Sequence, residues 1–189
     1  LLKGSAVVNL SLILRNGDII KELRDEVDAY EYDLTIIGGS AKRSMSHDMI
    51  QYINSSIFVV NNFNKTINYK ILLAVDNSPG TKKAVKYGVR VAQAFGIKVQ
   101  IITVSESENV NELDLKSSES ASKMMRRCGV EAETKFEIGK PEEKIIEMAG
   151  EDHIIIMGAS TQSPIAKFFV GSKPLNVMQN SNCPILIVK

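Results

Sequence analysis

One stretch of the sequence, residues 154–172, has the residue types and spacing of an anion-binding loop. An apolar run, Ile154–Met157, predicts a buried strand that stops at Gly158, and a polar turn follows. Gly171 and Ser172 then precede a segment with helical character. The first N–H groups of a helix lack intrahelical partners and carry partial positive charge, so such a loop could hold a phosphate. An ordinary strand–loop–helix connection would show the same glycines.

The elements that must position this loop alternate between strand and helix. From Tyr69 onward the chain shows short apolar runs separated by amphipathic segments, and polar or glycine-containing turns lie between them. Strands of this kind are covered on both faces, and their alternation with helices is typical of a parallel sheet. The predicted fold class is therefore α/β, with a doubly wound, mostly parallel, five-stranded sheet of Rossmann-like type. Its strands are expected at residues 70–75, 97–104, 130–137, 154–157 and 184–188.

The first part of the chain repeats the second half of this pattern. The segments L-I-L-R-N-G-D-I-I-K-E-L, D-L-T-I-I-G-G-S and S-S-I-F-V-V are similar to F-E-I-G-K-P-E-E-K-I-I, D-H-I-I-I-M-G-A-S and N-C-P-I-L-I-V. We interpret residues 1–62 as a partial copy of the unit, residues 63–68 as a polar linker and residues 69–189 as a complete domain. The strand–helix–strand that should open the first copy is missing. Because the sequence starts with Leu1 rather than Met, the expectation is a chain cut upstream rather than a degenerate domain.

Within this first copy, the loose alternation of residues 6–14 predicts a strand. Asp18 is expected to cap a helix that follows, and a second helix is expected over residues 46–53. The loop after Gly38 is shorter than its counterpart and lacks a Gly–Ser pair at the helix start. We therefore expect the first copy to bind no nucleotide.

The composition and net charge of the chain argue against some classes of protein, among them nucleic-acid-binding and membrane-spanning proteins. The chain has 189 residues, 44% hydrophobic and 24% charged, with a formal net charge of +1. That charge gives no general attraction to nucleic acid, and no apolar run is long enough to span a bilayer, so neither nucleic-acid binding nor direct membrane insertion is expected. Cys128 and Cys183 are isolated in the sequence and are expected to be reduced thiols, which favours a cytoplasmic protein.

Residues for catalysis or metal binding do not form recognisable patterns. His47 and His153 lie far apart without Cys or carboxylate at ligand spacing, so no metal site is predicted. The sequence has neither a nucleophile elbow nor a G-x-x-x-x-G-K-[ST] phosphate loop. No catalytic residue is predicted, and weak ATP hydrolysis or self-phosphorylation is the most that remains open.

Three motifs together resemble the universal stress protein family. They are V-D-N-S-P-G-T-K-K-A after the first strand of the complete unit, G-K-P before a helix, and the loop from Gly158 to Ser172 followed by C-P-I-L-I-V. The resemblance covers residues 70–189 end to end and residues 7–60 as a half copy. In family members that bind nucleotide, the loop reads Gly, two residues, Gly, nine residues, Gly, then Ser or Thr. Here the length and the ends agree, and Thr161 takes the place of the middle glycine.

The resemblance implies ATP or another adenine nucleotide as ligand, with Mg²⁺ only alongside ATP. Gly158 would let the backbone approach the nucleotide, Gly171 and Ser172 would face the phosphates, and Asp76 would lie beside the ribose or adenine. Backbone groups near Val104 would pair with the adenine edge. A threonine at position 161 would be strained if the backbone there needs a positive φ, which would weaken binding modestly. The full set of expected nucleotide-binding residues is Val75, Asp76, Asn77, Val104, Met157, Gly158, Ser160, Thr161, Gly171, Ser172 and Lys173.

The function that the resemblance implies is nucleotide binding in a regulatory or stress-response protein, which would act by changing conformation or assembly. A homodimer or an intrachain pseudo-dimer is expected, through the last strands at Ile57–Val60 and Pro184–Val188. Two alternatives remain: the soluble regulatory tail of a membrane transporter, and a dimerisation module that binds no nucleotide.

Overall fold

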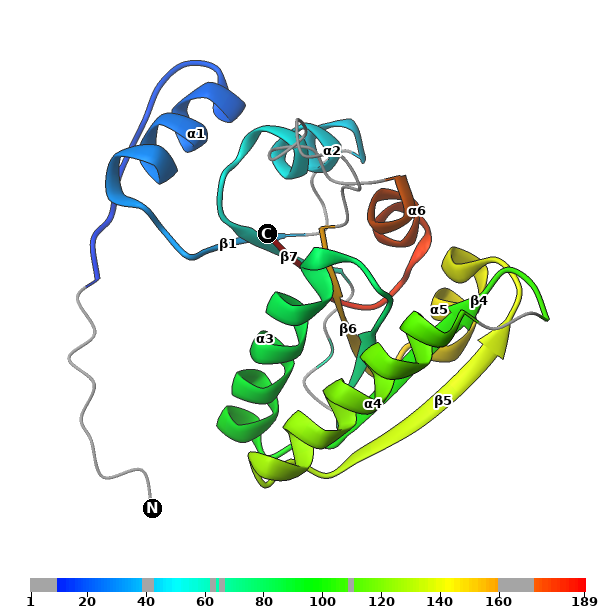
Figure 1. The fold of residues 1–189 in the computed structure, drawn as a ribbon. Helices are drawn as coiled ribbons and strands as arrows, with labels where there is room; N and C mark the ends of the chain where they lie inside the picture. Colours follow the sequence, from blue (N-terminus) through cyan, green and yellow to red (C-terminus); the bar gives the residue numbers. More distant parts are fainter. Residues whose placement is uncertain (1–9, 39–42, 62–63, 65–66, 109–110, 160–171) are drawn as a thin grey trace.

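A computed structural model describes residues 10–38, 43–61, 64, 67–108, 111–159 and 172–189. Helices and strands alternate along almost the whole of this chain, as the sequence predicts (Figure 1). In chain order, the elements are α1 (Ile19–Tyr30), β1 (Leu34–Gly38), α2 (Arg43–Tyr52), β2 (Ser56–Val60), β3 (Lys70–Ala74), α3 (Pro79–Phe95), β4 (Val99–Ser105), α4 (Glu112–Arg127), β5 (Ala132–Ile138), α5 (Pro141–Ala149), β6 (His153–Gly158), α6 (Ser172–Asn180) and β7 (Ile185–Val188).

The strands form one mixed sheet in the order β1-β2-β7-β6-β3-β4-β5. The mostly parallel α/β architecture is confirmed, because only the β2–β7 pairing is antiparallel. The expected five-stranded sheet is wrong for the chain as a whole, since β1 and β2 extend the five strands β3 to β7 into a seven-stranded sheet. The reason is the antiparallel junction, in which Ile57, Phe58 and Val59 pair with Ile187, Leu186 and Ile185. The expected pairing of these two strands therefore exists within a single chain.

Helices cover both faces of the sheet. Alternate residues of each strand point to opposite faces, so neighbours such as Leu72 and Leu73 are fully buried in two different cores. One core contains side chains of α1, α2, α5 and α6. The other contains side chains of α3 and α4, which lie next to each other in Figure 1. The first core runs across the β2–β7 junction, from Val27 to Ile187, and joins the two parts of the chain.

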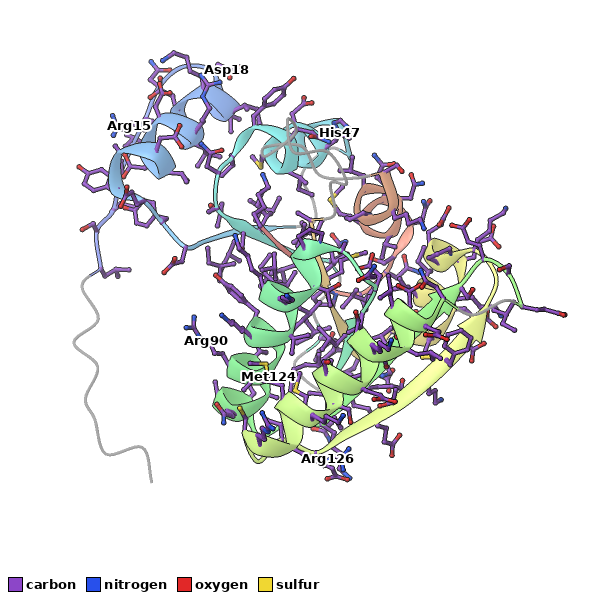
Figure 2. All side chains as sticks on the ribbon, viewed as in Figure 1. Arg15, Asp18, His47, Arg90, Met124 and Arg126 are labelled. Atoms are coloured by element: carbon purple, nitrogen blue, oxygen red, sulfur yellow. The ribbon has the colours of Figure 1, made fainter. Side chains whose placement is uncertain are left out.

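Helix α1 starts where its sequence predicts. Asp18 has an extended backbone, and its carboxylate accepts a hydrogen bond from the Lys21 N–H at 2.8 Å. The Arg15 guanidinium pairs with Glu26 at 2.6 Å and so links the chain before the helix to α1. Figure 2 labels Arg15 and Asp18 at this end of the molecule. The strand expected over residues 6–14 is wrong for its described part, because residues 10–14 belong to no strand. Leu10, Leu12 and Leu14 are more than nine-tenths exposed there.

None of the described helices combines the length and apolar character that a bilayer crossing requires.

Candidate functional site

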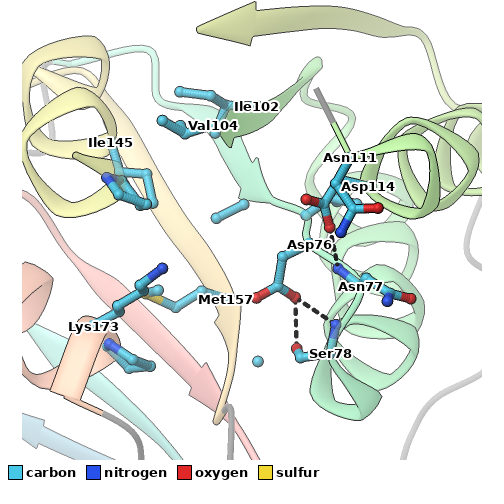
Figure 3. Close-up of a pocket in the computed structure, with 15 residues that line it drawn as sticks. Asp76, Asn77, Ser78, Ile102, Val104, Asn111, Asp114, Ile145, Met157 and Lys173 are labelled. Carbon is cyan, nitrogen blue, oxygen red and sulfur yellow. Dashed lines mark hydrogen bonds between the residues drawn. The ribbon is translucent and has the colours of Figure 1, made fainter. Parts of the chain in front are cut away.

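A cavity of about 280 Å³ opens at the carboxyl ends of β3, β4 and β6 (Figure 3). Open parallel sheets bind ligands at this edge, outside the ends of the strands. The cavity lies next to the place where strand order changes direction, between β3 and β6. Its lining consists of Ala74, Val75, Asp76, Asn77, Ser78, Ile102, Val104, Asn111, Asp114, Pro141, Ile145, Met157, Gly158, Lys173 and Pro174.

Asp76 forms the start of α3 as well as a wall of the cavity. Its Oδ1 accepts hydrogen bonds from the Ser78 N–H at 3.0 Å, the Ser78 hydroxyl at 2.5 Å and the Thr81 hydroxyl at 2.6 Å. A carboxylate two residues before the N–H that it accepts is a typical turn-forming arrangement. None of these bonds uses Oδ2, and Figure 3 shows the carboxylate directed into the cavity. Asp76 can therefore hold the turn and accept one more hydrogen bond from a ligand.

The first turn of α4 adds polar groups beside Asp76. The Asn111 side chain caps this helix by accepting from the Leu113 N–H at 3.0 Å. Asp114 Oδ1 accepts from the Asn77 N–H at 2.9 Å and so ties the loop after β3 to α4. Figure 3 shows Asn111, Asp114 and Asp76 grouped at one end of the cavity. This acidic end suits hydrogen-bond donors such as hydroxyl or amino groups.

Lys173, in the first turn of α6, supplies a positive charge to the cavity. Its ammonium group pairs with Glu106, which lies just after β4, at 2.9 Å. The hydrogen bond and the charge of Lys173 both lower the pKa of the Glu106 carboxyl. Both side chains are more than half exposed, so the ammonium group remains accessible to an anion.

Gly158 allows two backbone segments to meet at the floor of the cavity. A Cβ added at Gly158 would lie 2.5 Å from the carbonyl carbon of Gly80 in α3. The Ala159 N–H that follows donates to the Val188 carbonyl at 2.7 Å. The glycine is thus needed for packing against α3, whether or not a ligand also approaches it.

The structure brings together most of the residues expected from the sequence. Val75, Asp76, Asn77, Val104, Met157, Gly158 and Lys173 all line the cavity. Ser172 starts α6 and is exposed, but it does not belong to the lining. Ser160, Thr161 and Gly171 lie outside the described residues.

Sequence reasoning missed the contribution of α4 and α5 to the cavity. Asn111, Asp114, Pro141 and Ile145 all line it. A signal was available, because helices that follow parallel strands begin at the ligand-binding edge, and Asn111 is a typical helix-capping residue. Nothing in the sequence, however, indicated that Asp114 would bond to the Asn77 N–H.

Metal binding has no support in the described part of the chain. No group of three or more His, Cys, Asp or Glu side chains there could hold a metal ion. His47 lies on α2 (Figure 2), and His153 begins β6 with its ring nitrogen Nδ1 3.0 Å from the Ala149 carbonyl oxygen.

Comparison with known proteins agrees with this architecture. A model of the universal stress protein family matches residues 68–189. A universal stress protein of Methanocaldococcus jannaschii is 26% identical over 138 residues, which cover 64% of this chain and 81% of that protein.

Solved structures share the fold. The crystal structure of a universal stress protein from Archaeoglobus fulgidus gives a TM-score of 0.70 at 19% identity, and the match covers 92% of this chain and 66% of that one. The chain thus spans about two thirds of that protein. A universal stress protein crystallised in complex with cAMP gives a TM-score of 0.54 at 25% identity, and covers 65% of this chain and 98% of that one.

Proposed function

The chain belongs to the universal stress protein family, and from that premise we propose that the cavity between β3, β4 and β6 binds an adenine nucleotide. The observation that supports this most directly is the distribution of charged side chains in the cavity. Asp76 and Asp114 lie at one end, and Lys173 contributes from the start of α6. Hydrogen-bond donors of the adenine or ribose would occupy the acidic end, and the phosphates would lie near Lys173 and the α6 N-terminus. The related protein crystallised with cAMP supports an adenine nucleotide as the ligand class.

We propose binding without catalysis. Among the described residues of the lining, the charged side chains other than Lys173 are Asp76 and Asp114, and each already bonds a backbone N–H of the loop after β3. Rapid phosphoryl transfer needs metal ions and a positioned base or water, so a sensing role fits these residues better. Mg²⁺ would enter only with ATP. The ligand would act by changing conformation or assembly, and the free thiols of Cys128 and Cys183 fit a cytoplasmic protein.

Titration calorimetry with ATP, ADP, AMP and cAMP tests this proposal. We expect micromolar dissociation constants for at least one of these nucleotides. We also expect Gly171→Val to abolish binding, because the family resemblance implies that Gly171 faces the phosphates. Lys98→Gln serves as a control, because Lys98 pairs with Glu131 at 3.0 Å and does not line the cavity. The absence of heat with all four nucleotides would contradict the proposal and favour a purely structural module.

We also propose that residues 1–62 are a partial copy of the unit at 69–189, joined by the linker at 63–68. Strand registers support the repeat, since β1 pairs with β2 as β6 pairs with β7. Each β1 residue and its counterpart in β6 are separated by the same number of positions along the chain. Each β2 residue and its counterpart in β7 are likewise separated by a constant, slightly larger number. The matching pairs are Thr35–Ile57 with Ile155–Ile185, Ile36–Phe58 with Ile156–Leu186, Ile37–Val59 with Met157–Ile187, and Gly38–Val60 with Gly158–Val188. On this basis the β2–β7 junction would be an intrachain pseudo-dimer contact, and a homodimer is the alternative arrangement.

A further inference from the structure

A groove of about 590 Å³ runs between α3 and α4, the two helices that lie next to each other in Figure 1. Each helix contributes one stripe of side chains at helical spacing: Lys82, Val85 and Lys86 from α3, and Leu113, Ser117, Ala121 and Met124 from α4. From Leu113 to Met124 the groove is about 16 Å long, which corresponds to about three turns of a helix. It shares only the loop of Asp76, Asn77 and Ser78 with the cavity of Figure 3.

The floor of this groove is apolar. Val85 and Ala121 are buried there, and Met124, labelled in Figure 2, is partly buried beside them. Leu113, at the start of the α4 stripe, is 50% exposed. Methionine adapts its shape to different apolar side chains, which suits it to a binding surface. An apolar side chain placed in the groove would therefore cover apolar surface that now faces water.

Positive charge borders the same groove. Lys82 and Lys86 are exposed one turn apart on α3, and neither pairs with a carboxylate in the described part of the chain. Like charges at this spacing repel each other, and α3 has no acidic residue to offset them. Lys116 adds a third ammonium group, in an exposed pair with Glu112 at 3.6 Å. Asp76 is the one carboxylate in the described lining, and its Oδ1 is already bonded at the start of α3.

We propose that this groove is a docking site for an acidic amphipathic segment of another protein, about three helical turns long. Apolar side chains of the segment would lie on the floor between the helices, and its carboxylates would pair with Lys82 and Lys86. A nucleic-acid backbone or a lipid surface would match the charge, but neither would fill an apolar floor recessed between two helices. The inference is independent of nucleotide binding, because neither lysine lines the cavity of Figure 3.

Selection from a displayed library of random peptides, with the purified 189-residue chain as bait, tests the proposal. The peptides should be about 16 residues long, enough for three helical turns with flanks. We expect the enriched peptides to combine Asp or Glu with Leu, Met or Phe at helical spacing, and to bind more weakly as salt is added. Enrichment of no acidic peptide would overturn the proposal. Lys86-dependent binding of DNA, of phosphatidylserine vesicles or of a second copy of the chain would then identify the occupant instead.

A charge reversal in the groove tests the role of the lysines. Lys86→Glu should weaken binding of the most enriched peptide at least about tenfold in fluorescence anisotropy, because a like charge would face its carboxylates. Lys83→Glu is the matched control, since it makes the same change at an exposed position of α3 outside the groove, and it should cost less than about threefold. Replacing one acidic residue of the peptide by lysine should restore affinity for Lys86→Glu, which a misfolded variant could not do. Equal losses for the two variants would overturn the proposal.

The apolar contact has a control pair of its own on α4. Leu113→Ser should weaken peptide binding at least about fivefold, because an apolar contact of the groove would be lost. Leu115→Ser changes a side chain that is 42% exposed on the same helix but does not line the groove, and it should leave binding almost unchanged. Binding that tolerates Leu113→Ser as well as Leu115→Ser would contradict docking in this groove.

Discussion

Gly158 and Asp76 have structural roles at the edge of the sheet where the cavity opens. The sequence motif suggested that Gly158 makes room for a nucleotide, but its Cα already lies against the backbone of Gly80. The family resemblance implies that Asp76 lies beside a ligand, whereas the structure shows its Oδ1 accepting three hydrogen bonds that form the start of α3. These bonds depend on the turn that Ser78 and Thr81 adopt, which the sequence pattern alone does not specify.

Gly158→Ala tests the packing role of this glycine. The new Cβ would lie 2.5 Å from the Gly80 carbonyl carbon, a backbone atom that cannot move without shifting α3. We expect a loss of about 1–3 kcal/mol in the free energy of unfolding, measured by urea denaturation. Gly88→Ala is the control, because its Cβ would meet side-chain ends rather than backbone: the terminal methyl of Met125 at 3.2 Å and the two methyl groups of Leu73 at 3.6 Å. Its effect should be small, and equal losses for the two variants would contradict this explanation.

At the scale of elements, one ion pair connects α6 to the segment after β4 beside the cavity. Lys173 and Glu106 are 2.9 Å apart and both exposed, so water and salt screen the attraction and the pair is weak. A nucleotide phosphate would compete with Glu106 for the same ammonium group. We therefore expect Glu106→Gln to raise nucleotide affinity by up to about fivefold at low salt, measured by calorimetry.

A matched control exists for this ion pair. Glu131→Gln removes the partner of Lys98, in a pair of similar length and exposure that does not border the cavity, and it should leave affinity unchanged. Weaker binding by Glu106→Gln would show that Glu106 assists the ligand rather than competing with it.

Lys189, directly after β7, makes stability depend on pH. Its backbone N–H donates to the Ser56 hydroxyl at 3.3 Å, and its ammonium group donates to the Ile53 carbonyl. Burial lowers the pKa of Lys189 from 10.5 to about 8. Between these two values the unfolded chain binds more protons than the folded one, so the free energy of unfolding rises with pH from about 8 to about 10.5.

Lys189→Met tests this effect. The variant should be about 1–2 kcal/mol more stable at pH 7, after allowance for partial exposure of the amine, and should lose the rise in stability above pH 8. Thermal melts between pH 7 and 10.5 measure both effects. An unchanged pH profile would show that the amine is solvated in the folded protein.

The helices and strands themselves could largely be predicted, because each amphipathic or apolar segment carries its own pattern. The first turn of α1 illustrates this, since Asp18 caps it as its residue type indicates. The strand expected over residues 6–14 shows the limit. Alternation gives residues 10–14 the pattern of a strand, but a strand also needs a neighbour to bond with, and sequence pattern alone does not supply one.

At the scale of the whole molecule, the antiparallel pairing of β2 with β7 joins both parts of the chain into one sheet. Ile57 is fully buried in the core that reaches from α1 to β7. We expect Ile57→Ala to destabilise the protein by about 2–4 kcal/mol, because its cavity would lie in a core shared by both parts. Hydrogen exchange should then increase in α5 and β6 as well as in α1 and β2. Faster exchange confined to residues 10–60 would show that the first part unfolds by itself.

The contact between Gly80 and Gly158 also limits how this sequence can evolve. A side chain at either position meets the backbone of the other, so a larger residue at one site cannot be accommodated by shrinking its partner, which is already glycine. During evolution, the two positions should therefore change together. Both glycines should be retained, or both should be replaced in relatives where α3 lies farther from β6.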